Sequence, residues 1–136
     1  MNDLFINKVA TINRCIERIH QEFDNEANFK VNYTKQDSVI LNLQRACEAS
    51  IDMANMVIRG KKLGVPQSSR DSFSLLERDN ILDQSIAKSM QSMVGLRNVA
   101  VHDYQALNLD IVIHVITHHL NDFNEFVRQI AKAKLI

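Results

Sequence analysis

The 136-residue chain has only three glycines and one proline, and it has no tryptophan. So few turn-forming residues favour a small number of long helices over many short strands. The chain also lacks an excess of charge of either sign, because lysine plus arginine and aspartate plus glutamate number 16 each. Bulk charge therefore gives no support to a nucleic-acid-binding protein, and any contact with a nucleic acid would have to be local.

Cysteines are few and long apolar runs are missing. Cys15 and Cys47 each lie within an apolar helical pattern, so we expect two small buried side chains and neither a disulfide nor a metal site. The N-terminus shows no basic segment followed by an apolar run, and no apolar stretch approaches the ~20 residues of a membrane span. These absences predict a cytoplasmic protein with no membrane association.

Hydrophobic residues make up 46% of the chain and recur at the spacing of amphipathic helices. The length fits one domain, residues 1–136, with a single core. We therefore predict an all-α fold, an up-down helical bundle of four long helices plus a short one. The expected long helices cover residues 4–23, 34–59, 80–101 and 108–134, and the short one follows Ser68 and Ser69.

Local residues predict where the second long helix begins and ends. Thr34 is its expected N-cap, with Asp37 near its start, where the helix dipole favours an acid. Gly60 is expected to break the helix, and residues 24–33 are expected to form a polar connection. The basic residues in 59–62 either contact phosphate or complement the C-terminus of the helix.

The helix expected over residues 80–101 carries apolar residues around most of its circumference. A helix of this kind is buried on more than one side. We expect it to pack in its own bundle on one face and against a second copy of the chain on another, so the bundle is predicted to be homodimeric.

One segment, residues 95–104, carries the side chains best suited to chemistry. It places Arg97, Asn98, His102 and Tyr104 within eight positions. Arginine keeps its charge and binds phosphate in a planar fork, and histidine has a pKa suited to proton transfer near neutrality. Together they are what cleavage of a phosphodiester needs. The plainer alternative is an ordinary exposed cation and a histidine at a helix end.

Helical spacing sets a geometric condition on these residues. Asn98 and His102 would share one face of the helix, and Arg97 and Tyr104 a neighbouring stripe. Arg97 and His102 would then lie ~140° apart, so one flat substrate surface could not easily meet both. Either the helix loosens near Asp103, or the site is a groove, for example between two copies of the chain.

The motif resembles the R-x-x-x-x-H-x-Y signature of the HepT-like branch of the HEPN superfamily. Arg97 is followed by four residues and then His102, and one further residue separates His102 from Tyr104. Residues 43–52 also resemble the second helix of that family, and the resemblance extends over residues 33–130. It implies a toxin of a toxin–antitoxin pair that acts as a homodimeric, metal-independent endoribonuclease. Two copies of the motif would face each other in one cleft.

The resemblance also implies a mechanism without a cofactor. One His102 would take a proton from the 2′-hydroxyl of RNA, and the partner subunit's His102 would protonate the leaving oxygen. Arg97 would stabilise the charge on the phosphorane, and Asn98 would orient the imidazole or bind a phosphate oxygen. The product would carry a 2′,3′-cyclic phosphate, and DNA would be spared because it lacks the hydroxyl.

Tyr104 has a separate implied role. In the HepT-like family this tyrosine is the residue to which a minimal nucleotidyltransferase antitoxin transfers AMP from ATP. The added nucleotide would place phosphate beside Arg97, fill the groove and block the substrate. Without that function, Tyr104 would stack on the end of the bundle with its hydroxyl in water.

Other interpretations stay open beside this one. The chain could be a catalytically silent helical module that dimerises or docks onto a nucleotidyltransferase, which its zero net charge fits. His119 falls in a core stripe and is expected as a core histidine with one satisfied nitrogen, or as a residue beside the catalytic groove. His114 and His118 have the four-residue spacing of metal ligands, but the HExxH pattern is missing, so no metal site is predicted.

Overall fold

The computed structural model describes residues 3–134, so residues 1–2 and 135–136 of the expected domain lie outside it. The described residues form helices and no strand, which confirms the predicted all-α class. None of these helices has an apolar stretch long enough to cross a membrane. The elements in chain order are α1 (Asp3–Glu22), α2 (Glu26–Val31), α3 (Tyr33–Lys61), α4 (Ser69–Arg78), α5 (Gln84–His102), the 3-10 helix η1 (Tyr104–Ala106), α6 (Leu109–His118) and α7 (Leu120–Lys134).

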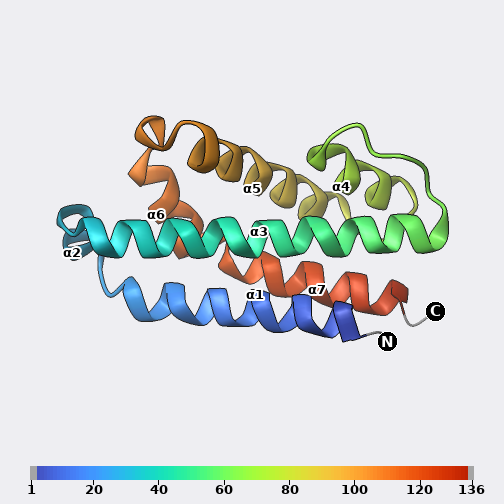
Figure 1. The fold of residues 1–136 in the computed structure, drawn as a ribbon, viewed down its shortest axis with the longest axis horizontal. Coiled ribbons are helices and arrows are strands. Elements are labelled where there is room, and N and C mark those ends of the chain that lie inside the picture. Colours follow the sequence, from blue (N-terminus) through green and yellow to red (C-terminus); the bar gives the residue numbers. More distant parts are fainter. Residues whose placement is uncertain (1–2, 135–136) are drawn as a thin grey trace.

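Helix α3 is the longest element, and the other long helices pack around it (Figure 1). Helix α1 lies along one side of it, α4 and α5 lie along another, and α7 completes the bundle. Helices α1, α3, α5 and α7 alternate in direction, so the predicted up-down arrangement is confirmed. Helix α2, η1 and α6 gather at one end, and the two ends of the described chain lie toward the other.

The core is continuous and rich in phenylalanine. Phe73 of α4 and Phe126 of α7 meet edge to face at a centroid distance of 5.7 Å, which ties the short helix to the bundle. Burial of an apolar side chain of this size stabilises the fold by about 1.5–3 kcal/mol, so the core fixes the frame that carries the motif. Five of the six phenylalanines are fully buried: Phe5, Phe29, Phe73, Phe123 and Phe126.

Residues 24–33 differ from the predicted polar connection, because they contain helix α2. Asn25 caps this helix, since its side-chain oxygen accepts a hydrogen bond from the N–H of Asn28 at 2.8 Å. Phe29 is fully buried, and its ring lies 5.2 Å from that of Phe23. A single buried aromatic among polar residues is too little to show a helical period, so the pattern did not reveal the helix.

Helix α3 extends past both of its predicted ends. Asn32, not Thr34, is the N-cap, and its side-chain oxygen accepts from the N–H of Lys35 at 3.0 Å. Gly60 lies inside the helix, because a glycine costs a helix only about 1 kcal/mol relative to alanine. The helix instead closes at Lys62, which takes the left-handed conformation (φ 54°).

Helix α5 begins later than predicted, after Asp83 and not at Asn80. Asn80 has a left-handed backbone (φ 59°), which belongs to a turn and cannot start a helix. Asp83 caps α5 by accepting from the N–H of Ile86 at 2.8 Å, and Gln129 of α7 exchanges two hydrogen bonds with it. Ser68 caps α4, as predicted.

The helix predicted over residues 108–134 is two helices, α6 and α7, that meet at a bend at His119 (Figure 1). His119 leaves helical geometry (φ −126°, ψ −1°), and its Nδ1 lies 2.9 Å from the Asp122 carboxylate, which also accepts from Ser89 of α5 at 2.6 Å. The side chain of His119 is 41% exposed, so the expected core position is wrong, although one ring nitrogen has a partner. The apolar stripe continues through the bend, which is why periodicity did not reveal it.

Candidate active site

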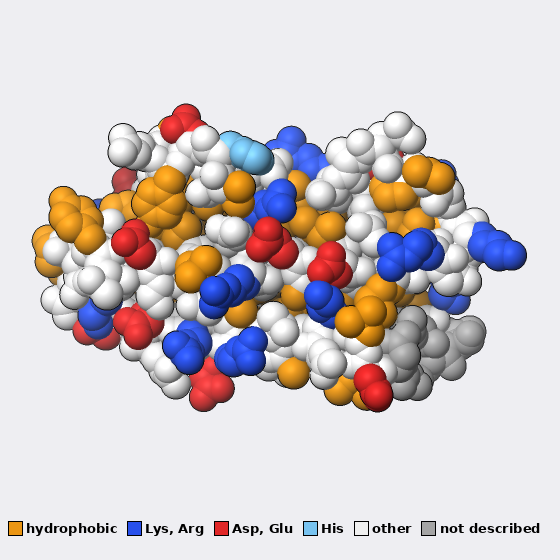
Figure 2. Space-filling model, viewed as in Figure 1, with side chains coloured by type: hydrophobic (Ala, Val, Ile, Leu, Met, Phe, Trp, Pro, Cys, Tyr) orange, Lys and Arg blue, Asp and Glu red, His pale blue; other side chains and the backbone are white. Residues whose placement is uncertain are grey.

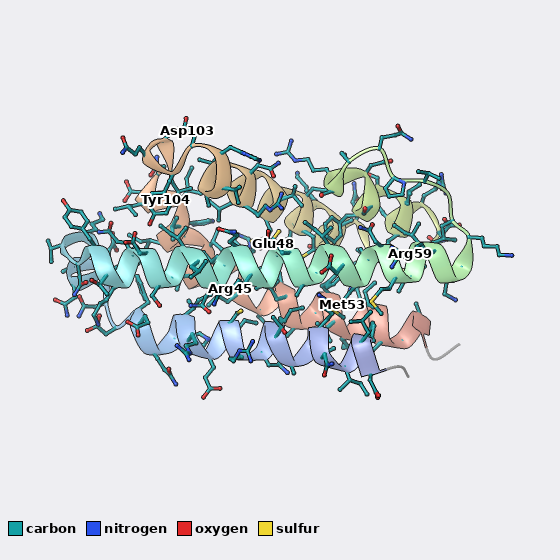
Figure 3. All side chains as sticks on the ribbon, in the orientation of Figure 1. Arg45, Glu48, Met53, Arg59, Asp103 and Tyr104 are labelled. Atoms are coloured by element: carbon teal, nitrogen blue, oxygen red, sulfur yellow. The ribbon has the colours of Figure 1, made fainter. Side chains whose placement is uncertain are left out.

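The motif lies where α5 ends and the chain turns toward α6 (Figure 3). Arg97 and His102 are on the last turns of α5, and Asp103 follows as the C-cap residue (φ −152°, ψ 63°). Tyr104 begins η1. The chain therefore leaves the helix at Asp103, which is one of the two predicted arrangements. The prediction that Tyr104 continues the helical stripe of Arg97 is wrong.

The Arg97 side chain is held against α3. Its Nη2 donates to Glu48 Oε2 at 3.1 Å, and its Nη1 donates to Asn98 Oδ1 at 3.0 Å. Its Nε is buried and has no partner within residues 3–134. The side chain is 26% exposed, and the hollow beside it measures about 10 Å³, which is room for about one water molecule. The guanidinium is fixed in place, but the described chain forms no pocket for a nucleotide around it.

His102 is exposed on the last turn of α5, so its imidazole is accessible. Among the described residues no hydrogen bond joins Asn98 to this imidazole, because the Asn98 oxygen accepts from Arg97 instead. In the single chain Asn98 therefore orients the guanidinium and not the imidazole. Val99 and Val101, on either side of Ala100, are both exposed, so apolar surface lies uncovered beside the histidine.

Tyr104 contacts Asp37, a residue far from the motif in the sequence. Its hydroxyl donates a hydrogen bond to Oδ1 of Asp37, in the second turn of α3. Burial, and then the hydrogen bond and charge of Asp37, raise the pKa of Tyr104 to about 12. Asp37 was expected only to complement the helix dipole. The two residues are 67 positions apart, and no local pattern could have joined them.

A groove between α1 and α3 opens beside Asp37, and the sequence did not predict the cluster of arginines that lines it. Arg14 and Arg18 of α1 and Arg45 of α3 line it, and we call it the three-arginine groove; it measures about 500 Å³. None of the three guanidinium groups has a hydrogen bond or ion pair within the described residues. Figure 2 shows lysine and arginine side chains gathered over α1 and the adjoining part of α3.

The three arginines also act together on a buried thiol. Burial raises the pKa of Cys15, and the charges of all three arginines oppose this rise, so all three lie within electrostatic reach of one sulfur atom. Burial raises the pKa of Cys47 to about 12. Both cysteines are buried and unpaired, as predicted, and neither is a thiolate near neutral pH.

The histidines of α6 pack against one another. The ring of His114 lies 4.7 Å from that of His118 and 5.2 Å from that of His119. Within residues 3–134 no group of three or more His, Cys, Asp and Glu side chains is placed to hold a metal ion.

A family model described as ribonuclease HepT-like matches residues 12–130. The chain belongs to this family. The resemblance to the HepT-like branch, which was based on the motif and on residues 43–52, is confirmed.

Two relatives and one solved structure show how close the similarity is. The mRNA nuclease HepT of Shewanella oneidensis is 60% identical over 127 residues, which cover 93% of this chain and 96% of the relative. The tRNA nuclease HepT of Aphanizomenon flos-aquae is 31% identical over 88 residues, which cover 65% of this chain and 60% of the relative. The tri-AMPylated HEPN toxin of Shewanella oneidensis in complex with MNT antitoxin has a TM-score of 0.93 at 58% identity, over 97% of this chain and 99% of that one.

Proposed function

We propose that this chain is the toxin of a toxin–antitoxin pair and acts as a metal-independent endoribonuclease. The observation that carries the proposal is the motif of Arg97, His102 and Tyr104 at an open end of a bundle that belongs to a ribonuclease family. The similar proteins of Shewanella oneidensis and Aphanizomenon flos-aquae are nucleases of mRNA and of tRNA, which supports RNA as the substrate class.

His102 and Arg97 divide the chemistry between them. An exposed imidazole takes the proton of the 2′-hydroxyl as that oxygen attacks the phosphorus, and a second imidazole protonates the leaving oxygen. Arg97 stabilises the charge that grows on the phosphorane, since Glu48 and Asn98 fix its guanidinium before the substrate arrives. The product carries a 2′,3′-cyclic phosphate, and DNA is not cleaved because it lacks the hydroxyl.

The chain acts as a homodimer in this proposal. One His102 cannot be both the base and the acid of the same step, whereas two copies supply both. Val99 and Val101 leave apolar surface uncovered beside His102, and a second copy would bury it. The hollow at Arg97 is too small for a nucleotide, and a cleft between two chains would provide the missing space.

Tyr104 is the proposed site of regulation. The residue is 44% exposed and therefore accessible to a partner protein. The similar toxin of Shewanella oneidensis is tri-AMPylated in its complex with MNT antitoxin, which supports such a partner here. We infer that a nucleotidyltransferase antitoxin transfers AMP from ATP to Tyr104. The added phosphate and nucleoside then repel and exclude RNA at the motif.

The three-arginine groove supplies the local positive charge that the neutral composition does not. Single-stranded nucleic acid is bound by positively charged grooves that follow its backbone. Arg45 lies on α3 one turn before Glu48, the partner of Arg97 (Figure 3). The groove therefore approaches the motif along one helix. We propose that the RNA backbone runs from the motif across Arg45, Arg18 and Arg14.

Cleavage of total cellular RNA in the presence of EDTA tests the proposed function. We expect the wild-type toxin, free of nucleotide on Tyr104, to cleave, and Arg97→Ala and His102→Ala to lower the rate by about 10²–10⁴-fold. Arg59→Ala and His118→Ala are matched controls, because both side chains are exposed and lie outside the motif. If a folded wild-type dimer does not cleave, the chain is the silent docking module instead.

A further inference from the structure

Asp37 lines the three-arginine groove, but its carboxylate makes its direct contact with Tyr104 and not with a guanidinium group. Within the described residues the Asp37 carboxylate accepts from the Tyr104 hydroxyl and forms no ion pair. Asp37 also lies past the first turn of α3, where the helix dipole is weaker. Neither a salt bridge nor a helix cap therefore accounts for this carboxylate, and the phenol of Tyr104 is its one partner in the described chain.

The geometry leaves the tyrosine open to chemistry. The Asp37 carboxylate, on α3, accepts the hydrogen bond of the hydroxyl. Tyr104 itself is 44% exposed and lies toward the end of the bundle (Figure 3). Because a large part of the residue is exposed, a partner protein can reach Tyr104 from solvent. The arrangement is that of a hydroxyl nucleophile with a base already in hydrogen-bond contact.

We propose that Asp37 is the proton acceptor when AMP is transferred to Tyr104, an inference that rests on the proposed function. The phenolic oxygen of Tyr104 attacks the α-phosphorus of ATP, and Oδ1 of Asp37 takes the phenolic proton. The bond from the α-phosphorus to the bridging oxygen breaks, and pyrophosphate leaves with the electron pair. Asp37 then releases the proton to water. The toxin thus supplies a catalytic group for its own inactivation.

A base is needed here because the phenol keeps its proton near neutral pH. Burial and the Asp37 carboxylate raise the pKa of Tyr104 to about 12, so the phenolate is on the order of 10⁻⁵ of the population at pH 7. A carboxylate in hydrogen-bond contact removes this barrier, because it accepts the proton while the new bond forms. The catalytic aspartate of protein kinases accepts the proton of a substrate hydroxyl in the same way.

The experiment measures AMP transfer from radiolabelled ATP to the purified, unmodified toxin by the MNT antitoxin of the Shewanella oneidensis complex. Asp37→Asn keeps an oxygen that can accept the hydrogen bond but removes the base, and Asp37→Glu keeps a carboxylate. Asp52→Asn is the matched control, since it changes a carboxylate of the same helix that pairs with Lys8 at 2.8 Å. Binding of each variant to the antitoxin is measured in parallel.

We expect Asp37→Asn to lower kcat of AMP transfer by about 10²–10⁴-fold with little change in KM for ATP, while Asp37→Glu recovers part of the loss. Asp52→Asn should match the wild type. A kcat of Asp37→Asn within about threefold of the wild type, or a loss explained entirely by weaker antitoxin binding, would overturn the proposal. RNA cleavage by the wild type is measured before ATP is added and tests the nuclease activity alone. A failure of the proposed nuclease function is therefore distinguished from a failure of the proposed role of Asp37.

Discussion

Two hollows toward opposite ends of the bundle differ in how their charged groups are used. The larger, about 670 Å³, lies between the ends of α3 and α7 and the turn before α5; we call it the distal cleft. The smaller, about 500 Å³, is the three-arginine groove beside Asp37. The charged side chains that line the distal cleft are Lys61, Asp79, Asp83, Arg128 and Lys132.

Three of the five charged side chains of the distal cleft have partners within the described chain, whereas Lys61 and Lys132 have none there. Arg128 pairs with Glu125, and Asp83 caps α5 and bonds to Gln129. In the three-arginine groove, three guanidinium groups face one carboxylate, Asp37, and none has a partner within the described chain. A paired group must give up its partner to bind a ligand, whereas an unpaired guanidinium binds phosphate directly. The three unpaired guanidinium groups gathered in one groove, and not the volume of a hollow, are therefore the basis of the proposed RNA path.

The largest effect is expected on RNA binding, when the arginines of the three-arginine groove are removed. We expect Arg14→Ala, Arg18→Ala and Arg45→Ala, combined, to weaken binding of a single-stranded RNA oligonucleotide by about tenfold or more. The slope of log affinity against log salt should fall by about 2, because each phosphate contact on a single strand contributes ~0.7. Fluorescence anisotropy measures both quantities, with all variants made in a His102→Ala background that we expect not to cleave the RNA.

The control for this prediction removes the same number of cations from the distal cleft. Lys61→Ala, Arg128→Ala and Lys132→Ala, combined, should leave RNA affinity and its salt slope near those of the parent. Equal weakening by both triple variants would mean that RNA responds only to net charge and that the groove has no special role.

Loss of the α5 cap should have a smaller effect, on stability. Asp83→Ala removes the N-cap and the partner of Gln129, so we expect the free energy of unfolding to fall by about 0.5–2 kcal/mol. Urea denaturation measures this change. Asp79→Ala, in the same cleft, removes only a surface pair with Arg78 and should cost less than about 0.5 kcal/mol. RNA cleavage at a temperature where both variants are folded should be unchanged, and a loss there would assign the cleft to the function.

The sequence predicted the features that depend on local residue patterns or on resemblance to a family. The long helices follow from apolar spacing, and the family assignment follows from the order of Arg97, His102 and Tyr104. The bend at His119 was missed because the apolar stripe runs through it, and the short helix α2 was missed because it buries only Phe29. Both depend on contacts outside their own segment.

The site was only partly predictable for the same reason. The sequence brought Arg97, His102 and Tyr104 to one segment, but the partners that set their chemistry come from other helices. Glu48 and Asp37 are 49 and 67 positions away from the residues they contact. Such pairings are decided by the packing of α3 against α5 and η1, which no spacing within one segment encodes.

The smallest expected effect concerns the ion pair of Glu125 with Arg128 beside the distal cleft. Hydrogen bonds from Arg128 and Gln129 lower the pKa of Glu125 from 4.5 to about 2. A carboxyl with a lowered pKa in the folded state stabilises the fold above its unfolded pKa, and this contribution is lost as the pH falls toward the folded pKa.

Glu125→Gln should therefore lower the Tm slightly at neutral pH, and the difference from wild type should shrink between pH 4.5 and about 2. Differential scanning calorimetry across this range measures it, and added salt should reduce the difference at neutral pH because the pair is screened. A difference in Tm that persists unchanged at the lowest pH would show that Glu125 acts through packing or neutral hydrogen bonds. The charge of Glu125 would then not stabilise the fold, and the contrast between paired and unpaired charge would not apply to this residue.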